Sequence, residues 1–261
     1  MKLRNLWITV GLALLFAVQP CKAQEITVAA ASDLQFAFQD VAARFQKDTG
    51  KKVQLIFGSS GNFFTQIQNG APFDVFFSAD IDYPKKLDAT GLVEPGTLYQ
   101  YATGKIVLWV PNESKLDLGQ GLRVLLDPSI KKIALANPKH APYGRAAVAA
   151  IKHEDLYDKV SAKFVLGENI SQTASFVTSG SADVGIVALS LALAPAMKQK
   201  GRYAEISTDA YPPLEQAAVI LKSSQKKDIA RQFLEFLKTP TILELLRSYG
   251  FSVPGGSAVA R

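Results

Sequence analysis

The sequence predicts an α/β protein with two lobes. Short apolar segments alternate with stretches of helical periodicity, which is the pattern of a sheet flanked by helices. The pattern restarts near residue 105, and no Gly/Ser-rich or Pro-rich linker separates the two series. We therefore expect strands that cross directly between the lobes, near 102–106 and 215–218.

The N-terminal residues 1–23 have the pattern of a cleaved secretory signal. Lys2 and Arg4 precede an apolar run at 6–18, and small residues stand at the cleavage positions before Gln24. We expect export and cleavage near Ala23. Lipidation of Cys21 is the alternative, but Val18-Gln19-Pro20 lacks the small residues that this processing requires.

Charge and cysteine content exclude several classes of function. Loss of residues 1–23 removes three basic residues and no acidic one, so the net charge falls from +6 to +3. The remaining lysine pairs are dispersed, which argues against nucleic-acid binding. Cys21 is the only cysteine, so the mature chain has no disulfide, cysteine metal site or thiol nucleophile.

The first series of elements begins with strands at 26–31, 53–57 and 73–77. The helix after Ser32 has apolar residues at helical spacing and ends at Gly50. A shorter helix is expected to be capped by Asn62 and to end at Gly70, and another covers 84–90. Tyr99 and Tyr101 have the spacing of one face of a strand.

The second series contains strands at 105–110, 133–136, 164–166 and 184–187 and helices at 144–152 and 171–178. A strand at 217–221 then leads into two C-terminal helices, the second starting at Thr239-Pro240 and stopping at Gly250. We expect lobe 1 to comprise 24–104 and 217–261, with the C-terminal helices returning to it, and lobe 2 to comprise 105–216.

Four helix starts have the character of an anion site. Ser32-Asp33 and Ser59-Ser60 follow strands in the first series, and Pro142-Tyr143-Gly144 and Glu168-Asn169-Ile170-Ser171 precede helices in the second. A helix start offers free N–H groups and about half a positive charge, so four supply about two charges. Each motif alone is more often a cap or a turn, and only their recurrence in both lobes favours binding.

Several longer motifs resemble the periplasmic molybdate-binding proteins of ABC importers. The resemblance covers nearly the whole mature sequence and lies in 26–32, in Phe57-Gly58-Ser59-Ser60, in 70–80, in 137–144, in Val184-Gly185-Ile186-Val187 and in Tyr249-Gly250-Phe251.

The resemblance implies a type II periplasmic binding-protein fold, in which each lobe is a mixed sheet flanked by helices and the ligand lies in a hinged cleft. The ligand would be molybdate, and also tungstate, bound by Ser32 and Ser60 through hydroxyl and main-chain N–H groups and by Tyr143 and Ile170 through main-chain N–H groups. Asp33, Ser59 and Ala188 are additional cleft candidates. Ala188 stands where a tyrosine is common, so the Tyr143 hydroxyl is a candidate replacement.

The resemblance also implies the partners. An inner-membrane ABC permease with its cytoplasmic ATPase would receive the oxyanion from a periplasmic monomer. We expect no enzymatic activity, no cofactor and no direct bond between protein and metal, because molybdenum would be bound as its oxyanion.

Two alternatives stay open from the residues themselves. A fully ionised tetrahedral oxyanion only accepts hydrogen bonds, whereas phosphate keeps a proton and needs an acceptor. Asp33 therefore leaves a phosphate receptor open, although we expect its carboxylate to cap the helix and point away. A receptor for another oxyanion such as sulfate also stays open.

An exported serine hydrolase is less favoured. Gly58-Ser59-Ser60-Gly61-Asn62 lacks the final glycine of a nucleophile elbow centred on Ser60. Only His140 and His153 remain in the mature chain, and both are expected to lie at the surface.

Overall fold

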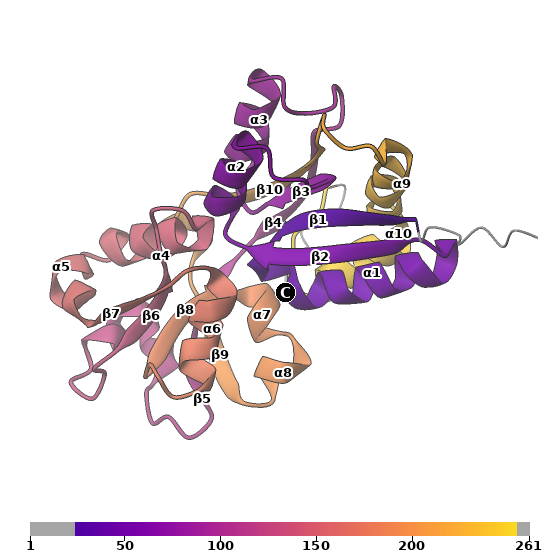
Figure 1. Cartoon of the computed structure of the whole chain (residues 1–261). Helices are drawn as coiled ribbons and strands as arrows, with labels where there is room; N and C mark the ends of the chain where they lie inside the picture. Colours follow the sequence, from indigo (N-terminus) through magenta and orange to yellow (C-terminus); the bar gives the residue numbers. More distant parts are fainter. Residues whose placement is uncertain (1–23, 255–261) are drawn as a thin grey trace, which may run out of the picture.

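The computed structural model describes residues 24–254, so the predicted signal at 1–23 lies outside the described residues. The described residues form two sheets with helices packed on them, in two lobes that lie next to each other (Figure 1). The predicted α/β class with two lobes is confirmed. Over the described range, no helix combines the length and the apolar character that a membrane crossing needs.

The first sheet has five strands in the order β2-β1-β3-β10-β4. The strands β1, β2 and β3 are parallel, and β10 runs antiparallel to both of its neighbours. Their bounds are Glu25–Ala31 (β1), Lys52–Gly58 (β2), Val75–Ser78 (β3), Tyr99–Gly104 (β4) and Leu214–Ile220 (β10). Because β10 comes from late in the chain, two separate chain segments build this sheet.

The second sheet repeats this arrangement in the order β7-β6-β8-β5-β9. The strands β6, β7 and β8 are parallel, and β5 is antiparallel to β8 and β9. Their bounds are Ile106–Pro111 (β5), Ile133–Ala136 (β6), Phe164–Gly167 (β7), Val184–Ala188 (β8) and Gly201–Glu205 (β9). The sequence did not predict β9, a short, partly polar strand at the sheet edge.

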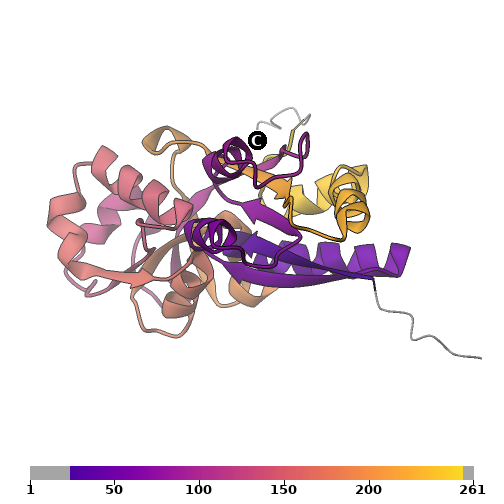
Figure 2. The ribbon, with the colours of Figure 1, turned by 45° about the horizontal axis from the view of Figure 1, so that its top comes forward.

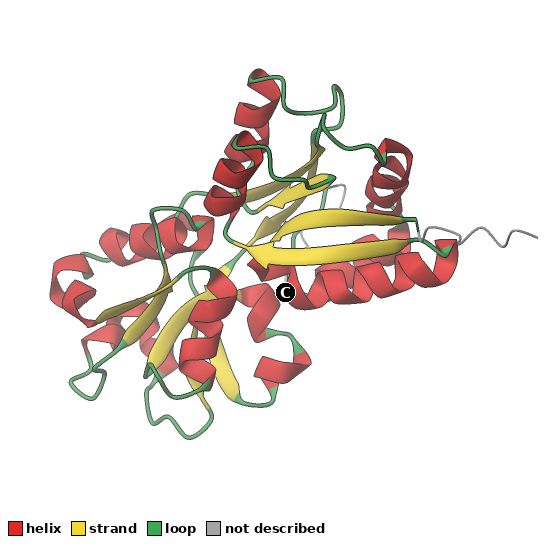
Figure 3. Ribbon diagram, in the orientation of Figure 1, coloured by secondary structure: helices red, strands yellow, loops and turns green. Residues whose placement is uncertain are grey.

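Helices cover both faces of the first sheet, as Figure 3 shows. One apolar cluster joins the sheet to α1, α9 and α10, and another joins the opposite face to α2 and α3. Their bounds are Gln35–Thr49 (α1, preceded by the 3-10 turn η1, Ser32–Leu34), Ser60–Gln68 (α2), Asp82–Ala89 (α3), Lys227–Leu237 (α9) and Pro240–Ser248 (α10). The C-terminal helices therefore pack on the same sheet as the first helix.

A single continuous core fills the second lobe. The helices that surround it are η2 (Leu118–Leu126), α4 (Pro142–His153), α5 (Tyr157–Val160), η3 (Ser161–Lys163), α6 (Ile170–Thr178), α7 (Leu189–Ala192), α8 (Pro195–Lys198) and η4 (Thr208–Ala210). This core also includes Ala31, the last residue of β1, and Ala79, which directly follows β3. Apolar packing therefore continues from one lobe to the other.

The chain crosses between the lobes at two adjacent places. β4 ends at Gly104 and β5 begins at Ile106, while the return crossing runs from η4 into β10. Leu214 at the start of β10 pairs with Gly104, so the two crossings lie side by side (Figure 2). Two neighbouring extended segments are a natural hinge between rigid lobes.

One predicted helix start is wrong. Asn62 does not cap α2, because the helix begins two residues earlier at Ser60, with Ser59 in extended geometry as its N-cap. Asn62 is the third residue of the helix, and its side chain donates to Glu168 in the other lobe. The predicted end of α1 is confirmed, since Gly50 has the left-handed φ of 72°.

An aromatic group around Phe77 connects the first sheet to its helices. Its ring centroid lies 4.8 Å from that of Phe38, 5.3 Å from Tyr101 and 5.9 Å from Phe233, and all four side chains are fully buried. These rings join α1, β3, β4 and α9 into one interior.

We expect Phe77→Ala to lower the free energy of unfolding by about 3–5 kcal/mol, because it removes a buried ring and leaves a cavity. Urea unfolding followed by circular dichroism measures this. Ile56→Ala is the control, since Ile56 on β2 is 38% exposed, and we expect a loss of less than about 1 kcal/mol. Equal losses in the two variants would contradict the central place given to Phe77.

Candidate functional site

Strand register brings the helix starts of each lobe together. In the first sheet Ala31 pairs with Gly58, so β1 and β2 end side by side. In the second sheet Ala136 pairs with Gly167, so β6 and β7 do the same. Ligands of such sheets bind beyond the carboxyl ends of parallel strands, where helices begin. Each lobe therefore presents two helix starts at one edge of its sheet.

The first lobe contributes two buried serines. Ser32 opens η1 directly after β1, and Ser60 is the first residue of α2. The Ser60 Oγ accepts the backbone N–H of Ala79 at 2.9 Å, and the Ser32 Oγ accepts that of Ser171 at 3.4 Å. Because each oxygen already accepts a bond, the hydroxyl proton of each serine is left to donate elsewhere.

The second lobe contributes two helix starts that offer mainly backbone N–H groups. α4 begins with Pro142, and Tyr143 follows. A proline is well suited to the first position of a helix, because a backbone N–H at that position would have no partner within the helix. α6 begins at Ile170 after Asn169, whose side chain accepts the backbone N–H of Gln172 at 2.9 Å. At both starts the first backbone N–H groups have no partner within the helix.

These helix starts surround one small cavity between the lobes. Ser32, Ser60, Tyr143 and Ile170, predicted from the sequence, all line it, and so do Asp33 and Ser59. The remaining lining residues, which the sequence did not single out as contacts, are Ala31, Gly58, Ala79, Ala141 and Pro142. No lysine or arginine lines this cavity of the described chain, so the positive potential within it comes from backbone dipoles.

Ala188 is not among the residues that line the cavity. It is fully buried at the end of β8 and forms the N-cap of α7. The next turn of chain instead directs Ser190 to the first lobe, where its Oγ donates to the backbone carbonyl of Asp33 at 2.7 Å. The short helix α7, which follows β8, thus contacts the first lobe through Ser190.

Asp33 does not cap a helix, contrary to the expectation from sequence. Its Oδ2 accepts the Tyr143 hydroxyl at 2.9 Å and the Gln216 amide at 2.8 Å, and neither η1 nor α1 has a side-chain cap. The Tyr143 hydroxyl is therefore engaged by Asp33 and Gln216. Gln216 was missed, although a polar residue within the apolar strand Leu214–Ile220 was the available signal.

Burial favours the neutral forms of Asp33 and Tyr143. Removal from water raises the pKa of Asp33 to about 6, from an ordinary value of 3.8, and outweighs the opposing hydrogen bonds from Gln216 and Tyr143. Burial also raises the pKa of Tyr143 well above its usual value, and the nearby Asp33 adds to the shift. Both phenol and carboxyl are thus stabilised in their neutral forms.

The two lobes are in contact around the cavity. The backbone N–H of Gly61 on α2 donates to the carbonyl of His140 at 2.9 Å, and the Ser59 Oγ lies 3.0 Å from the His140 Nδ1. On the other side of the cleft, Ser171 on α6 donates its hydroxyl to Gln35 on α1 at 2.6 Å. These contacts describe a closed cleft.

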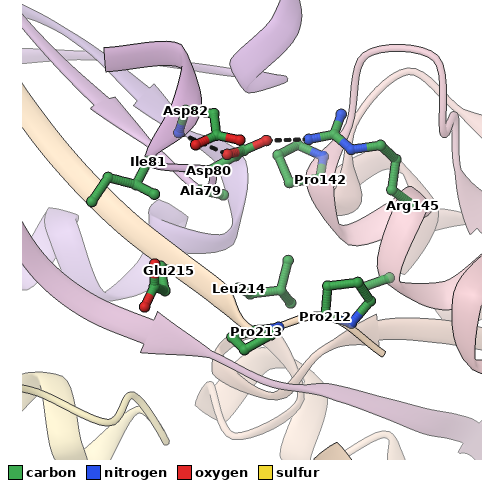
Figure 4. A pocket seen from close by; sticks show the side chains of 11 residues that line it. Ala79, Asp80, Ile81, Asp82, Pro142, Arg145, Pro212, Pro213, Leu214 and Glu215 are labelled. Atoms are coloured by element: carbon green, nitrogen blue, oxygen red, sulfur yellow. Dashed lines mark hydrogen bonds and ion pairs between the residues drawn. The ribbon is translucent and has the colours of Figure 1, made fainter. Parts of the chain in front are cut away.

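A second pocket opens beside the hinge and shares Ala79 and Pro142 with the cavity. Asp80 of the first lobe points toward Arg145 on α4, and the two form an ion pair across the cleft (Figure 4). Arg145 also donates to the Tyr83 hydroxyl at 3.3 Å. The Ala79-Asp80 stretch thus contributes to the contact between the lobes.

The serine and histidine residues considered for a hydrolase are arranged differently from what the sequence predicted. Ser60 contacts no histidine in the described chain; its neighbour Ser59 contacts His140, whose Nε2 lies 3.6 Å from the Glu168 carboxylate. His153 is exposed, as expected. Among residues 24–254, no cluster of three or more His, Cys, Asp or Glu could hold a metal ion.

Known proteins resemble this chain over almost its full length. A family model described as bacterial extracellular solute-binding protein matches residues 26–252. The molybdate-binding protein ModA of Rhodobacter capsulatus is 39% identical over 244 residues, which cover 94% of this chain and 92% of that protein. The ModA of Azotobacter vinelandii is 38% identical over 251 residues, covering 96% and 98% respectively.

The fold agrees with this similarity. The structure of the Azotobacter vinelandii periplasmic molybdate-binding protein matches with a TM-score of 0.83, at 38% sequence identity, and covers 88% of this chain and 99% of that one. The expected two-lobed arrangement of the type II periplasmic binding proteins, each lobe a mixed sheet flanked by helices, is thereby confirmed.

The raised pKa of Asp33 predicts a pH dependence of stability. The folded state binds the Asp33 proton more tightly than the unfolded chain, so this stabilisation is complete below about pH 4 and is lost as pH rises through about 6. We expect the free energy of unfolding of the wild type to fall by about 3 kcal/mol more than that of Asp33→Asn over this interval. Urea unfolding at pH 4 to 7 measures the difference, and parallel pH profiles would contradict it.

Proposed function

We propose that this chain, which belongs to the family of bacterial extracellular solute-binding proteins, captures molybdate and delivers it to an ABC importer. The supporting observation is the convergence of four helix starts, two from each lobe, on one cavity without a basic side chain. The ligand contacts would be the hydroxyl and N–H groups of Ser32 and Ser60 and the backbone N–H groups of Tyr143 and Ile170.

Charge supports a divalent anion. Each helix start carries about half a positive charge, so four together balance about two negative charges. The donors are backbone N–H groups and serine protons, which suit a ligand that only accepts hydrogen bonds. A molybdate ion, tetrahedral and fully ionised at neutral pH, has this character, and tungstate shares it.

Bond length distinguishes molybdate from sulfate. The metal–oxygen bonds of molybdate and tungstate are longer than the S–O bonds of sulfate, so a cavity shaped for the larger ion aligns poorly with the smaller one. Each misaligned charge-assisted hydrogen bond loses about 1.5–3 kcal/mol. We therefore propose that both group 6 oxyanions bind and that sulfate and phosphate are rejected.

Closure couples binding to delivery. We propose that lobe 1 comprises 24–104 and 217–261, lobe 2 comprises 105–216, and the lobes open and close about the adjacent crossings. A ligand that contacts both lobes only in the closed form shifts the population toward closure. The permease, with its ATPase, would then recognise the closed monomer in the periplasm.

We propose that the chain is not an enzyme and needs no cofactor. The Ser59–His140 contact is the one observation that favours a hydrolase. The Glu168 carboxylate is 3.6 Å from the histidine, and its side chain is 59% exposed, so it would orient the imidazole weakly. Turnover of a p-nitrophenyl ester by the wild type and its loss in Ser59→Ala would favour the hydrolase instead.

Isothermal titration calorimetry of the mature protein with molybdate, tungstate, sulfate and phosphate tests the proposed ligand. We expect molybdate and tungstate to bind and the other two to bind far more weakly.

Ser60→Ala removes one donor, so molybdate affinity should fall severalfold or more. Ser223→Ala in an exposed loop is the control. Tighter binding of sulfate would overturn the size argument, and unchanged affinity in Ser60→Ala would remove this serine from the site.

Gly61 offers a test of closure that leaves the cavity intact. A Cβ atom at Gly61 would lie 2.7 Å from the His140 carbonyl oxygen and 2.9 Å from its Cα, so an alanine there separates the lobes. Within a helix, alanine is also more favourable than glycine by about 1 kcal/mol. We therefore expect Gly61→Ala to bind molybdate at least about tenfold more weakly without a lower melting temperature.

The matched control for Gly61→Ala is Gln66→Ala on the exposed face of the same helix, which should keep wild-type affinity. Calorimetry and differential scanning fluorimetry measure both properties. If Gly61→Ala binds like the wild type, closure at this contact does not contribute to capture.

A further inference from the structure

Asp33 is the one acidic residue among those that line the cavity. Its side chain is 1% exposed, and no lysine or arginine of the cavity wall offsets its charge. An ionised carboxylate beside a divalent oxyanion would repel it in a medium of low dielectric. The presence of a carboxyl group in a binding site for such an ion therefore requires an explanation.

The hydrogen bonds around Asp33 have a fixed direction. The Tyr101 hydroxyl donates to the Gln216 Oε1 at 2.7 Å, which turns the amide Nε2 of Gln216 toward Asp33. That Nε2 also donates to the Tyr143 oxygen at 3.0 Å, so the Tyr143 proton is directed to Asp33. Both donors therefore reach the same carboxyl oxygen, Oδ2.

The other carboxyl oxygen has a different environment. Oδ1 of Asp33 is buried and has no hydrogen-bond partner among the described residues. A neutral carboxylic acid matches this asymmetry, because Oδ2 is then the carbonyl oxygen that accepts two bonds and Oδ1 carries the proton. An O–H group at Oδ1 is a donor for a ligand in the cavity, whereas an ionised Oδ1 is only an acceptor.

We propose that Asp33 is a neutral acid in the bound state and donates its Oδ1 proton to the oxyanion, so that capture is coupled to uptake of one proton. This inference rests on the proposed function and adds a donor to that site. The proton comes from solvent when the carboxylate of the free protein is ionised, and it stays on Asp33, so no covalent bond of the ligand changes.

The surroundings of Asp33 favour the neutral form. The titratable groups that face it are the phenols of Tyr101 and Tyr143, and both have raised pKa values through burial and through Asp33 itself. α6 and α7, which pack on η1, carry no charged residue, and the charged residues of α1 and β2 are exposed: Asp40, Arg44, Lys47, Asp48 and Lys52. Burial raises the pKa of Asp33 to about 6 in this closed form, and a bound anion would raise it further.

The test is calorimetric titration with sodium molybdate at pH 6.5, 7.5 and 8.5, in two buffers of different ionisation enthalpy. We expect the wild type to take up about one proton per molybdate at pH 7.5 and its affinity to fall by up to about tenfold for each pH unit above that. Asp33→Asn imitates the neutral acid, so it should take up no proton and keep a constant affinity. Asp48→Asn, an exposed acid on α1, is the control and should behave as the wild type.

Two outcomes would overturn the inference while leaving the proposed function intact. One is molybdate binding by the wild type without proton uptake and with constant affinity. The other is an Asp33→Asn protein that is folded by circular dichroism but binds at least tenfold more weakly than the wild type at pH 8.5. If Asp33→Asn does not fold, proton uptake by the wild type alone decides.

Failure of the proposed function gives a different result. In that case neither the wild type at pH 6.5 nor Asp33→Asn binds molybdate. Tight binding of inorganic phosphate at pH 7.5 would show instead that an ionised Asp33 accepts a hydrogen bond from the protonated ligand, and would overturn both proposals.

Discussion

The register of two pairs of parallel strands is the constraint on which the site depends. Ala31 pairs with Gly58 in one sheet, and Ala136 pairs with Gly167 in the other. A shift of one residue in either pair would turn the strand ends to different sides and move the helix starts apart. Because β1 and β6 are largely buried within their sheets, the core of each lobe positions donors that have no charge of their own.

Backbone donors suit a site that must distinguish ions by charge and shape. A lysine or arginine attracts most anions, and its long side chain adapts to ions of different size. Main-chain N–H groups at a helix start are held by the helix itself and cannot accept a hydrogen bond from a protonated ligand. The cavity thus combines a fixed geometry with a positive potential that balances about one divalent anion.

The cleft is closed by polar contacts of two kinds. Exposed or half-exposed pairs such as Asp80–Arg145 contribute little each, because water screens them. The buried group of Asp33, Tyr143, Gln216 and Tyr101 is different, since removal of one partner leaves another buried polar atom unsatisfied. This group lies where the second crossing enters β10, so the same residues connect the hinge, the lobe contact and the cavity wall.

The sequence by itself determined most of the strands and longer helices, the two-lobed α/β class and the segments in which the four helix starts lie, because these follow from local periodicity and from serine, proline and glycine at strand and helix ends. It did not determine β9, whose short, partly polar strand has no strong period, or the start of α2, where consecutive serines allow more than one cap.

Only the tertiary structure decided which side chains meet. Asp33, Tyr143 and Gln216 are separated by 73 to 183 residues along the chain, yet they share hydrogen bonds within 3.0 Å. No local pattern could assign the Tyr143 hydroxyl to Asp33 or remove Ala188 from the cavity wall. Those assignments depend on how the two sheets are set against each other across the hinge, which is a property of the folded whole.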